Sequence, residues 1–204
     1  MHIAIAGNIG SGKTSLAELL AYHYGWETHL EDVDENPYLV DFYEDMKRWS
    51  FNLQVFFLNS RFSSVLKIHQ SGQTVIQDRT IYEDAYIFAA NLFDMSLMSR
   101  RDLDNYLAVF EIMSNLVKAP DLLIYLKASV PTLVNQIQIR GREYESNIRI
   151  DYLKNLNNRY DDWIQTYSKG KLLIINVDEL DFIKNKADLG TIIDKVNAQL
   201  HGLF

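Results

Sequence analysis

A glycine-rich segment near the start of the chain has the composition and spacing of a phosphate-binding loop. Residues 7–14 read Gly-Asn-Ile-Gly-Ser-Gly-Lys-Thr and satisfy the pattern G-x-x-x-x-G-K-[S/T]. Glycines allow backbone conformations that point successive N–H groups inward, and a following helix adds the positive end of its dipole. A plain glycine turn is the alternative interpretation. The apolar run before the segment and the helical pattern after it favour a nucleotide site.

Two residues of this loop have individual expected roles. Lys13 should reach the β- and γ-phosphates of ATP, and Thr14 should offer its hydroxyl to Mg²⁺. The full set expected to bind the nucleotide is Gly7, Asn8, Ile9, Gly10, Ser11, Gly12, Lys13, Thr14 and Ser15. Such a loop does not identify what receives the phosphate, because motors, GTPases, ABC-type ATPases and metabolite kinases share it.

A second short motif offers a GTPase as an alternative. GTPases read guanine with N-K-x-D, and residues 185–188 read Asn-Lys-Ala-Asp. No apolar strand run leads into these residues, so we interpret the match as accidental. No apolar run ends in the acidic residue of a motor ATPase together with a signature segment. Size and elimination therefore favour a small kinase.

Charged residues follow two further apolar runs, at the edge where doubly wound sheets place their ligands. Asp78 could hold Mg²⁺ or its water, and Arg79 could stabilise the transferring phosphoryl group. Capping of the next helix is the alternative for this acidic cluster, which also contains Asp84. In residues 30–37 most carboxylates are expected to be solvated. Glu31, nearest the strand end, is our candidate general base for a hydroxyl acceptor.

Two arginines around a glycine form the last candidate cluster. Arg140 and Arg142 flank Gly141 at the end of a predicted helix. Their guanidinium groups could close over phosphates as a lid and exclude water. The alternative is a helix that ends in basic residues with Gly141 as its stop.

The elements that must position these residues alternate along the chain. Short apolar runs typical of buried strands lie at 2–6, 74–77, 122–126 and 172–177, with a weaker one at 27–31. Helical patterns lie between and after them, at 13–24, 49–69, 81–92, 99–118, 131–140, 148–168 and 187–201. Strand followed by helix, repeated, predicts an α/β fold: a five-stranded parallel sheet wrapped by helices on both faces. The apolar stripes of 49–69 and 99–118 fit either core packing or a dimer interface.

Composition limits the classes of protein that fit. The chain has 204 residues, 48% of them hydrophobic, with no marked linker, so we expect a single domain over residues 1–204. The net charge of −7 argues against nucleic-acid binding. The absence of cysteine excludes disulfides and thiolate metal sites. With no signal peptide or membrane-spanning run in the sequence, we expect a cytoplasmic protein with no membrane partner.

Over nearly the whole chain, these motifs resemble the deoxynucleoside kinase family, which includes deoxycytidine, deoxyguanosine and bacterial deoxyadenosine kinases. The similar segments are G-N-I-G-S-G-K-T, E-D-V-D-E-N-P, R-W-S-F-N-L-Q, D-R-T-I-Y-E-D, R-G-R-E-Y-E and D-E-L-D-F. The resemblance implies a P-loop kinase fold with an arginine-containing lid. It also implies ATP as donor, Mg²⁺ as cofactor, a small-molecule deoxynucleoside as acceptor, and a homodimer.

The resemblance also implies roles for individual residues. Glu31 matches the general base, although the family usually has proline where Asp32 stands; Asp78 and Arg79 match the pair that handles Mg²⁺ and the 5'-oxygen. Gln54, Arg61, Asp84 and Phe88 match residues that recognise the base. The remaining matches are Tyr43 and Glu145 for the sugar 3'-hydroxyl, Arg140 and Arg142 for the lid, and Asp181 and Phe182 for the adenine-contacting loop.

These motifs define the type of reaction better than they define which deoxynucleoside is the acceptor. The Arg61 and Asp84 pair argues against a thymidine-type enzyme, and overall likeness to bacterial enzymes favours deoxyadenosine. Another purine deoxynucleoside or deoxycytidine is the alternative acceptor. The alternative functions are a nucleoside monophosphate kinase of the thymidylate kinase type and a non-catalytic nucleotide-binding switch.

Overall fold

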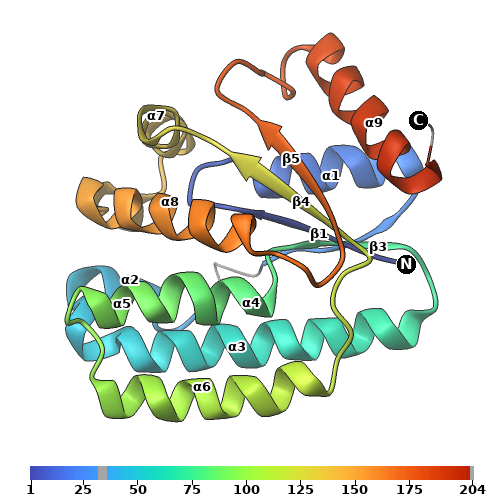
Figure 1. Cartoon of the computed structure of the whole chain (residues 1–204). Helices are drawn as coiled ribbons and strands as arrows, with labels where there is room; N and C mark the ends of the chain where they lie inside the picture. Colours follow the sequence, from blue (N-terminus) through green and yellow to red (C-terminus); the bar gives the residue numbers. More distant parts are fainter. Residues whose placement is uncertain (32–35, 203–204) are drawn as a thin grey trace.

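A parallel β-sheet runs through the centre of the computed structural model, which describes residues 1–31 and 36–202, without the side chains of 146 and 147. The five strands pair in the order β2-β3-β1-β4-β5 (Figure 1). Their bounds are β1 His2–Gly7, β2 Glu27–His29, β3 Val75–Asp78, β4 Leu122–Lys127 and β5 Lys171–Asn176. The prediction of a five-stranded parallel sheet is confirmed.

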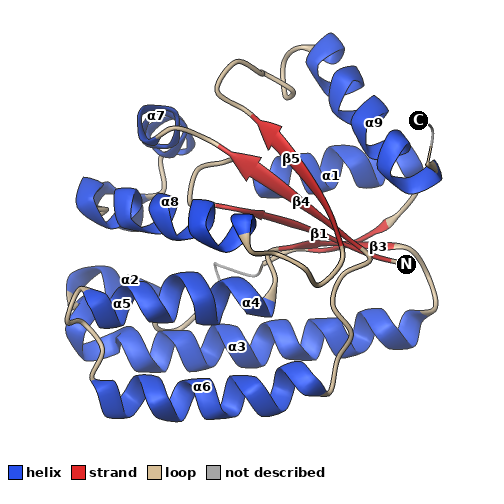
Figure 2. Ribbon diagram, in the orientation of Figure 1, coloured by secondary structure: helices blue, strands red, loops and turns tan. Residues whose placement is uncertain are grey.

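Helices occupy most of the remaining described chain (Figure 2). The α-helices are α1 Lys13–Tyr24, α2 Leu39–Glu44, α3 Met46–Ser71, α4 Ile81–Glu83, α5 Ala90–Asp94, α6 Arg100–Asn115, α7 Val130–Arg140, α8 Ile150–Gln165 and α9 Lys186–His201. A π-helix, η1 Asp84–Ala89, joins α4 to α5, and a 3-10 helix, η2 Glu143–Asn147, follows α7. The sequence did not predict α2, and the regular helix predicted over 81–92 is wrong in its middle, where η1 lies.

Alternating side chains of β1 face two separate layers of the core. Ala4 and Ala6 pack in one cluster with apolar residues of α3, η1 and α8. Ile3 and Ile5 pack in the other, with residues of α1 and α9. Because both faces of β1 are buried, its sequence is a continuous apolar run without alternating polar residues. In Figure 1, α3 and α6 of the first layer lie below the sheet, and α1 and α9 lie above β1 and β3.

The carboxyl ends of adjacent strands meet at one edge of the sheet. The phosphate loop follows β1, Asp78 ends β3, and Glu31 lies shortly after β2. Parallel pairing aligns Ile5 of β1 with Asp78 of β3. The order β2-β3-β1 therefore brings three segments that are far apart in sequence to the same edge, as expected for ligand sites in open α/β sheets.

The Asn-Lys-Ala-Asp match is a helix start in the structure. The side chain of Asn185 accepts a hydrogen bond from the Ala187 N–H at 3.0 Å and caps α9. Asp188 accepts one from the Asp181 N–H at 2.8 Å. These side chains are used by the local fold, in agreement with our interpretation of the motif as accidental.

Within residues 1–31 and 36–202, no helix combines the length and the apolar character that a bilayer crossing requires.

Candidate active site

The phosphate loop wraps around the start of α1 in a conformation that needs its glycines. Gly10 has a φ of 85°, and a Cβ there would lie 2.7 Å from the Leu133 carbonyl oxygen. Gly12 has a φ of 89° and directly precedes α1. Both angles lie in the left-handed region that favours glycine. The loop therefore has the backbone conformation and the position before a helix N-terminus that the motif predicts, and anion binding there stays a prediction.

Lys13 is buried in the first turn of α1. Its Nζ donates a hydrogen bond to the Asn8 carbonyl oxygen at 3.0 Å. Burial lowers the pKa of Lys13, and the nearby Arg79 lowers it further, to about 8. The ammonium group thus remains largely charged at neutral pH, in a site where little water screens it. Lys13 therefore has the charge and the place that its predicted role beside the β- and γ-phosphates requires.

Thr14 and Asp78 meet where the loop faces the end of β3. The Thr14 hydroxyl donates to Asp78 Oδ2 at 2.5 Å. Asp78 is 3% exposed, and its Oδ1 has no hydrogen-bond partner among the described residues. A buried carboxylate oxygen without a partner beside a hydroxyl leaves oxygen ligands available for a hard cation.

Arg79 adopts an unusual backbone conformation at the end of β3. Its φ is 70°, which is uncommon for a residue with a side chain. Its N–H donates to the Ile5 carbonyl oxygen at 2.9 Å and so continues the strand pairing with β1. The guanidinium lies 4.5 Å from the centre of the Phe88 ring and 3.7 Å from Glu31 Oε2. Strained backbone of this kind is typical of functional sites.

Glu31 is held between two arginines. Arg61 Nη2 donates to Glu31 Oε1 at 2.7 Å, and Arg79 Nη1 lies 3.7 Å from Oε2. Burial raises the pKa of Glu31, but the two guanidinium groups outweigh it and bring the pKa to about 2. Glu31 is therefore ionised at neutral pH, with its carboxylate oriented before any ligand binds.

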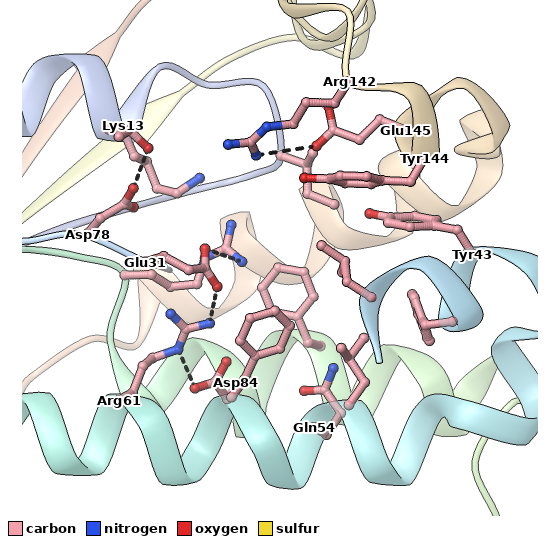
Figure 3. A pocket seen from close by; sticks show the side chains of 18 of the residues that line it. Lys13, Glu31, Tyr43, Gln54, Arg61, Asp78, Asp84, Arg142, Tyr144 and Glu145 are labelled. Carbon is pink, nitrogen blue, oxygen red and sulfur yellow. Dashed lines mark hydrogen bonds and ion pairs between the residues drawn. The ribbon is translucent and has the colours of Figure 1, made fainter. Parts of the chain in front are cut away.

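A pocket leads from these residues toward α3, and polar side chains line its far end (Figure 3). Gln54 is 2% exposed, and its Oε1 has no hydrogen-bond partner within the described part of the chain. Arg61 Nε donates to Asp84 Oδ2 at 2.5 Å. Burial raises the pKa of Asp84, while the charge of Arg61 opposes this effect. An amide and a buried ion pair at the end of a closed pocket can recognise a flat polar ligand by its edge.

The opposite wall of the pocket carries Tyr43, Tyr144 and Glu145. The rings of Tyr43 and Tyr144 stack with centroids 5.8 Å apart. Arg140 donates to both oxygens of Glu145, at 2.6 to 3.0 Å. Arg142 Nη1 lies 3.9 Å from Glu145 Oε1. Both arginines predicted to form a lid are thus paired with the carboxylate expected to hold the sugar. Gly141 ends α7 with a φ of 67°, as the alternative interpretation predicts.

A separate recess lies on the outer side of the phosphate loop. Phe182 is 5% exposed, and a Cβ at Gly12 would lie 2.9 Å from its ring. The recess is lined by the loop glycines, by residues of α7 and by the segment after β5, including Asp181. The loop that follows β5 therefore lies against the phosphate loop, and its contact with adenine stays a prediction.

Most predicted site residues come together in one pocket. It is lined by Ile9, Lys13, Thr14, Glu31, Tyr43, Gln54, Arg61, Asp78, Arg79, Asp84, Phe88, Arg140, Arg142 and Glu145. Asn8 instead donates to the Leu153 carbonyl oxygen at 3.0 Å and ties the loop to α8. Gly7, Ser11 and Ser15 belong to the loop or the first turn of α1 without lining this pocket. Asp32 lies outside the described residues.

Sequence reasoning missed several residues of the site. Leu39, Phe42 and Tyr152 line the pocket, and their sequence pattern is that of ordinary core residues. Glu83 is completely buried beside Arg79, and no role of its own was predicted for it from the sequence. The capping-box spacing Thr-x-x-Glu was visible in the sequence, whereas burial of the carboxylate was not.

Comparison with known proteins gives consistent matches over nearly the full chain. A family model described as "Deoxynucleoside kinase" matches residues 3–201. The "Deoxyadenosine/deoxycytidine kinase" of Bacillus subtilis (strain 168) is 37% identical over 201 residues, which cover 98% of this chain and 93% of the relative. The "Deoxyadenosine kinase" of Dictyostelium discoideum is 39% identical over 182 residues, covering 89% and 74%.

Solved structures give the same result. A deoxyadenosine kinase from M. mycoides with the products dCMP and a flexible dCDP bound superimposes with a TM-score of 0.87 at 30% identity. That match covers 97% of this chain and 100% of the other. The same enzyme with dATP bound gives a TM-score of 0.84 at 31% identity, covering 97% and 99%.

Proposed function

The chain belongs to the deoxynucleoside kinase family and phosphorylates deoxynucleosides with ATP, and we propose that it transfers the γ-phosphate to the 5'-hydroxyl, with deoxyadenosine as preferred acceptor. One observation carries the proposal: Glu31 lies between the phosphate loop and a pocket that ends in Gln54 and the Arg61–Asp84 ion pair (Figure 3). An acceptor hydroxyl at Glu31 would meet the donor phosphate on one side, with the base extending toward α3.

In the proposed mechanism, three charged residues act on the reacting atoms. Glu31 accepts the proton of the 5'-hydroxyl as that oxygen attacks phosphorus. Lys13 and Arg79 stabilise the negative charge on the transferring phosphoryl group, and their burial strengthens this effect because little water screens them. The bond to the β-phosphate oxygen breaks, and ADP leaves.

A Mg²⁺ ion is the proposed cofactor, and the residues at the end of β3 fit it. The Thr14 hydroxyl and the unpartnered Asp78 Oδ1 supply oxygen ligands. Within the residues that the structure describes, no group of three or more His, Cys, Asp or Glu side chains is arranged to hold a metal, so phosphate oxygens and water would complete the coordination. When bound, the ion would neutralise charge on the β- and γ-phosphates.

The remaining pocket residues are proposed to recognise the acceptor and the donor. Gln54 and the Arg61–Asp84 pair bind the base edge, and Phe88 stacks on the base. Tyr43 and Glu145 bind the 3'-hydroxyl. When the donor binds, Arg140 and Arg142 leave Glu145 and pair with the donor phosphates. Asp181 and Phe182 contact the adenine of the donor.

The preference for deoxyadenosine rests on similarity. The relatives in Bacillus subtilis and Dictyostelium discoideum are named for deoxyadenosine, the first also for deoxycytidine. A coupled assay of ATP consumption against the four deoxynucleosides and their four monophosphates tests the proposal. We expect the highest kcat/KM for deoxyadenosine and no turnover with monophosphates. Preference for a monophosphate would contradict the proposed acceptor, whereas preference for another deoxynucleoside would correct only the base.

Replacing Gln54 with alanine should weaken acceptor binding specifically. The base edge would face a buried wall without a partner, which costs about 1–3 kcal/mol. The KM for the deoxynucleoside should therefore rise while the KM for ATP stays unchanged in steady-state kinetics. Asn59, an exposed amide on the same helix, provides the control, and Asn59→Ala should leave both values unchanged. A rise in the ATP KM alone would remove Gln54 from the acceptor pocket.

A homodimer through α3 and α6 is also proposed. These adjacent helices leave apolar side chains exposed: Val55 at 42%, Leu66 at 36%, Val109 at 42% and Ile112 at 66%. Light scattering should give about twice the chain mass of 23.7 kDa. The double variant Val109→Asp, Ile112→Asp should be monomeric because two buried charges would oppose association.

A matched control for the dimer lies on the opposite layer. Tyr22 on α1 is 92% exposed, and Tyr22→Asp should remain dimeric. A monomeric wild-type protein, or an unchanged mass in the double variant, would contradict this interface. The single domain over residues 1–204 and the cytoplasmic location stay predictions.

A further inference from the structure

Glu83 is a fully buried carboxylate that the proposed mechanism does not use. It is the last residue of α4, four residues after Arg79, and its exposure is 0%. Its Oε2 accepts hydrogen bonds from the Thr80 N–H at 2.7 Å and from the Thr80 hydroxyl at 3.2 Å. These contacts form a capping box at the start of the helix.

The second oxygen of Glu83 is turned away from the cap and toward the active site. Oε1 accepts from the Tyr160 hydroxyl at 2.8 Å and from the Gly7 N–H, at the start of the phosphate loop, at 3.3 Å. The same atom lies 3.7 Å from Arg79 Nε. One carboxylate oxygen thus faces both the phosphate loop and the arginine expected at the transferring phosphate.

Capping alone does not explain a glutamate at this position. A glutamine completes a capping box equally well, and it carries no charge into the core. Burial raises the pKa of Glu83, although Arg79 opposes this effect, so the buried charge is costly. All the groups around the carboxylate are donors, and only an ionised carboxylate accepts from all of them.

Arg79 needs such an external support. Its backbone has a φ of 70°, which nearby contacts must maintain. Its guanidinium faces two carboxylates, Glu31 at 3.7 Å and Glu83 at 3.7 Å. Without Glu83, pairing with Glu31 would draw the guanidinium toward the acceptor side of the pocket.

We infer that Glu83 is a positioning residue: its carboxylate fixes the guanidinium of Arg79 relative to the first residue of the phosphate loop. The inference rests on the proposed role of Arg79 at the transferring phosphate. Glu83 touches neither substrate and acts through Arg79. Its removal should therefore lower kcat more than it alters the KM of the deoxynucleoside.

Glu83→Gln separates this role from capping. The amide can keep its oxygen on Thr80 and donate from nitrogen to the Tyr160 hydroxyl, which rotates to accept. The Gly7 N–H and Arg79 Nε then face the glutamine NH₂, which is itself a donor. These two contacts are therefore lost, while the helix cap remains. Displacement of a catalytic group by about 1 Å can cost about 10²-fold in rate, and we expect a fall in kcat of that order.

Tyr160→Phe is the matched control. It removes one donor to Glu83 but leaves the charge and the contacts with Gly7 and Arg79. Its kcat should stay within about threefold of wild type, because the lost hydrogen bond lies at a distance from the reacting atoms and the carboxylate keeps its contacts with Gly7 and Arg79. Thermal unfolding with and without ATP confirms that each variant is folded and binds the donor.

A double-mutant cycle on kcat that combines Glu83→Gln with Arg79→Ala measures the coupling between the two residues. In the Arg79→Ala background, Glu83→Gln should lower kcat by no more than about threefold, because the residue through which it acts is absent. The same factor in both backgrounds, or a wild-type kcat for Glu83→Gln alone, would overturn the inference. If Glu83→Gln is unfolded, Glu83→Asp replaces it, since the shorter carboxylate cannot span Thr80 and Gly7, and the same outcomes apply.

The cycle also separates the two levels of the argument. An impaired Arg79→Ala with a normal Glu83→Gln would contradict the positioning role and leave the proposed function intact. A normal kcat for Arg79→Ala would contradict the role proposed for Arg79 itself and, with it, the inference for Glu83.

Discussion

Lys13→Ala should reduce kcat by roughly 10³-fold or more, because it removes the cation that neutralises the transferring phosphate. Lys13 is 7% exposed, and its Nζ donates to the Asn8 carbonyl oxygen at 3.0 Å, so the ammonium is held within the loop that binds phosphate. The lowered pKa of about 8 means that the group is still mostly protonated at neutral pH. Its charge is therefore available for catalysis without reorganisation.

The fold should tolerate the loss of Lys13. The side chain lines the ligand pocket rather than the apolar core, and burial of its charge does not favour the folded state. Turnover of the purified variant and its thermal unfolding midpoint check both statements. Lys195→Ala, an exposed lysine on α9, is the matched control and should retain full activity. Near-normal turnover in Lys13→Ala would contradict the phosphate-loop assignment.

Glu31→Gln should depress kcat by about 10²–10⁴-fold, the usual contribution of one general base. Glutamine keeps the shape of the side chain but cannot accept the hydroxyl proton. The pKa of about 2 keeps Glu31 ionised at neutral pH, so wild type always presents the basic form. The KM values of both substrates should stay within a few-fold, because binding uses other groups.

Neighbouring acidic residues provide the controls for Glu31. Asp34 and Glu35 lie outside the described residues, and the sequence predicts that they are solvated charges. Asp34→Asn and Glu35→Gln should therefore leave kcat almost unchanged. An effect of tenfold or less at Glu31 together with a large effect at either control would identify a different carboxylate as the base.

The convergence of the site could be predicted from the sequence because it follows from topology. Parallel strands order their carboxyl ends at one edge, so a loop after β1, an acid–arginine pair at β3 and a carboxylate after β2 must approach each other. The helices also followed from apolar periodicity, and α1 has the predicted bounds. The residues proposed to recognise the base were different: family resemblance alone implied their roles, and the structure brings Gln54, Arg61 and Asp84 into one pocket.

Features that depend on tertiary contacts could not be predicted. The π-helix η1 interrupts a stretch whose periodicity is that of a regular helix. The positive φ of Arg79 is maintained by its surroundings, and nothing in local propensity favours it. Glu83 has the spacing of an ordinary capping residue, and only its complete burial against Gly7 and Arg79 distinguishes it. The ion pair between Arg140 and Glu145 was not predicted either, because the resemblance implies a lid role for Arg140 and a sugar-binding role for Glu145.

The position of the new phosphate on the acceptor distinguishes transfer to the 5'-hydroxyl from transfer to the 3'-hydroxyl and from hydrolysis. The purified protein is incubated with Mg²⁺, deoxyadenosine and ATP, and the product is analysed by two-dimensional ¹H–³¹P NMR. We predict a phosphomonoester phosphorus that couples to the 5'-protons of deoxyadenosine. Phosphorus coupled to the 3'-proton, or inorganic phosphate as the only new phosphorus species beside ADP, would contradict transfer to the 5'-hydroxyl.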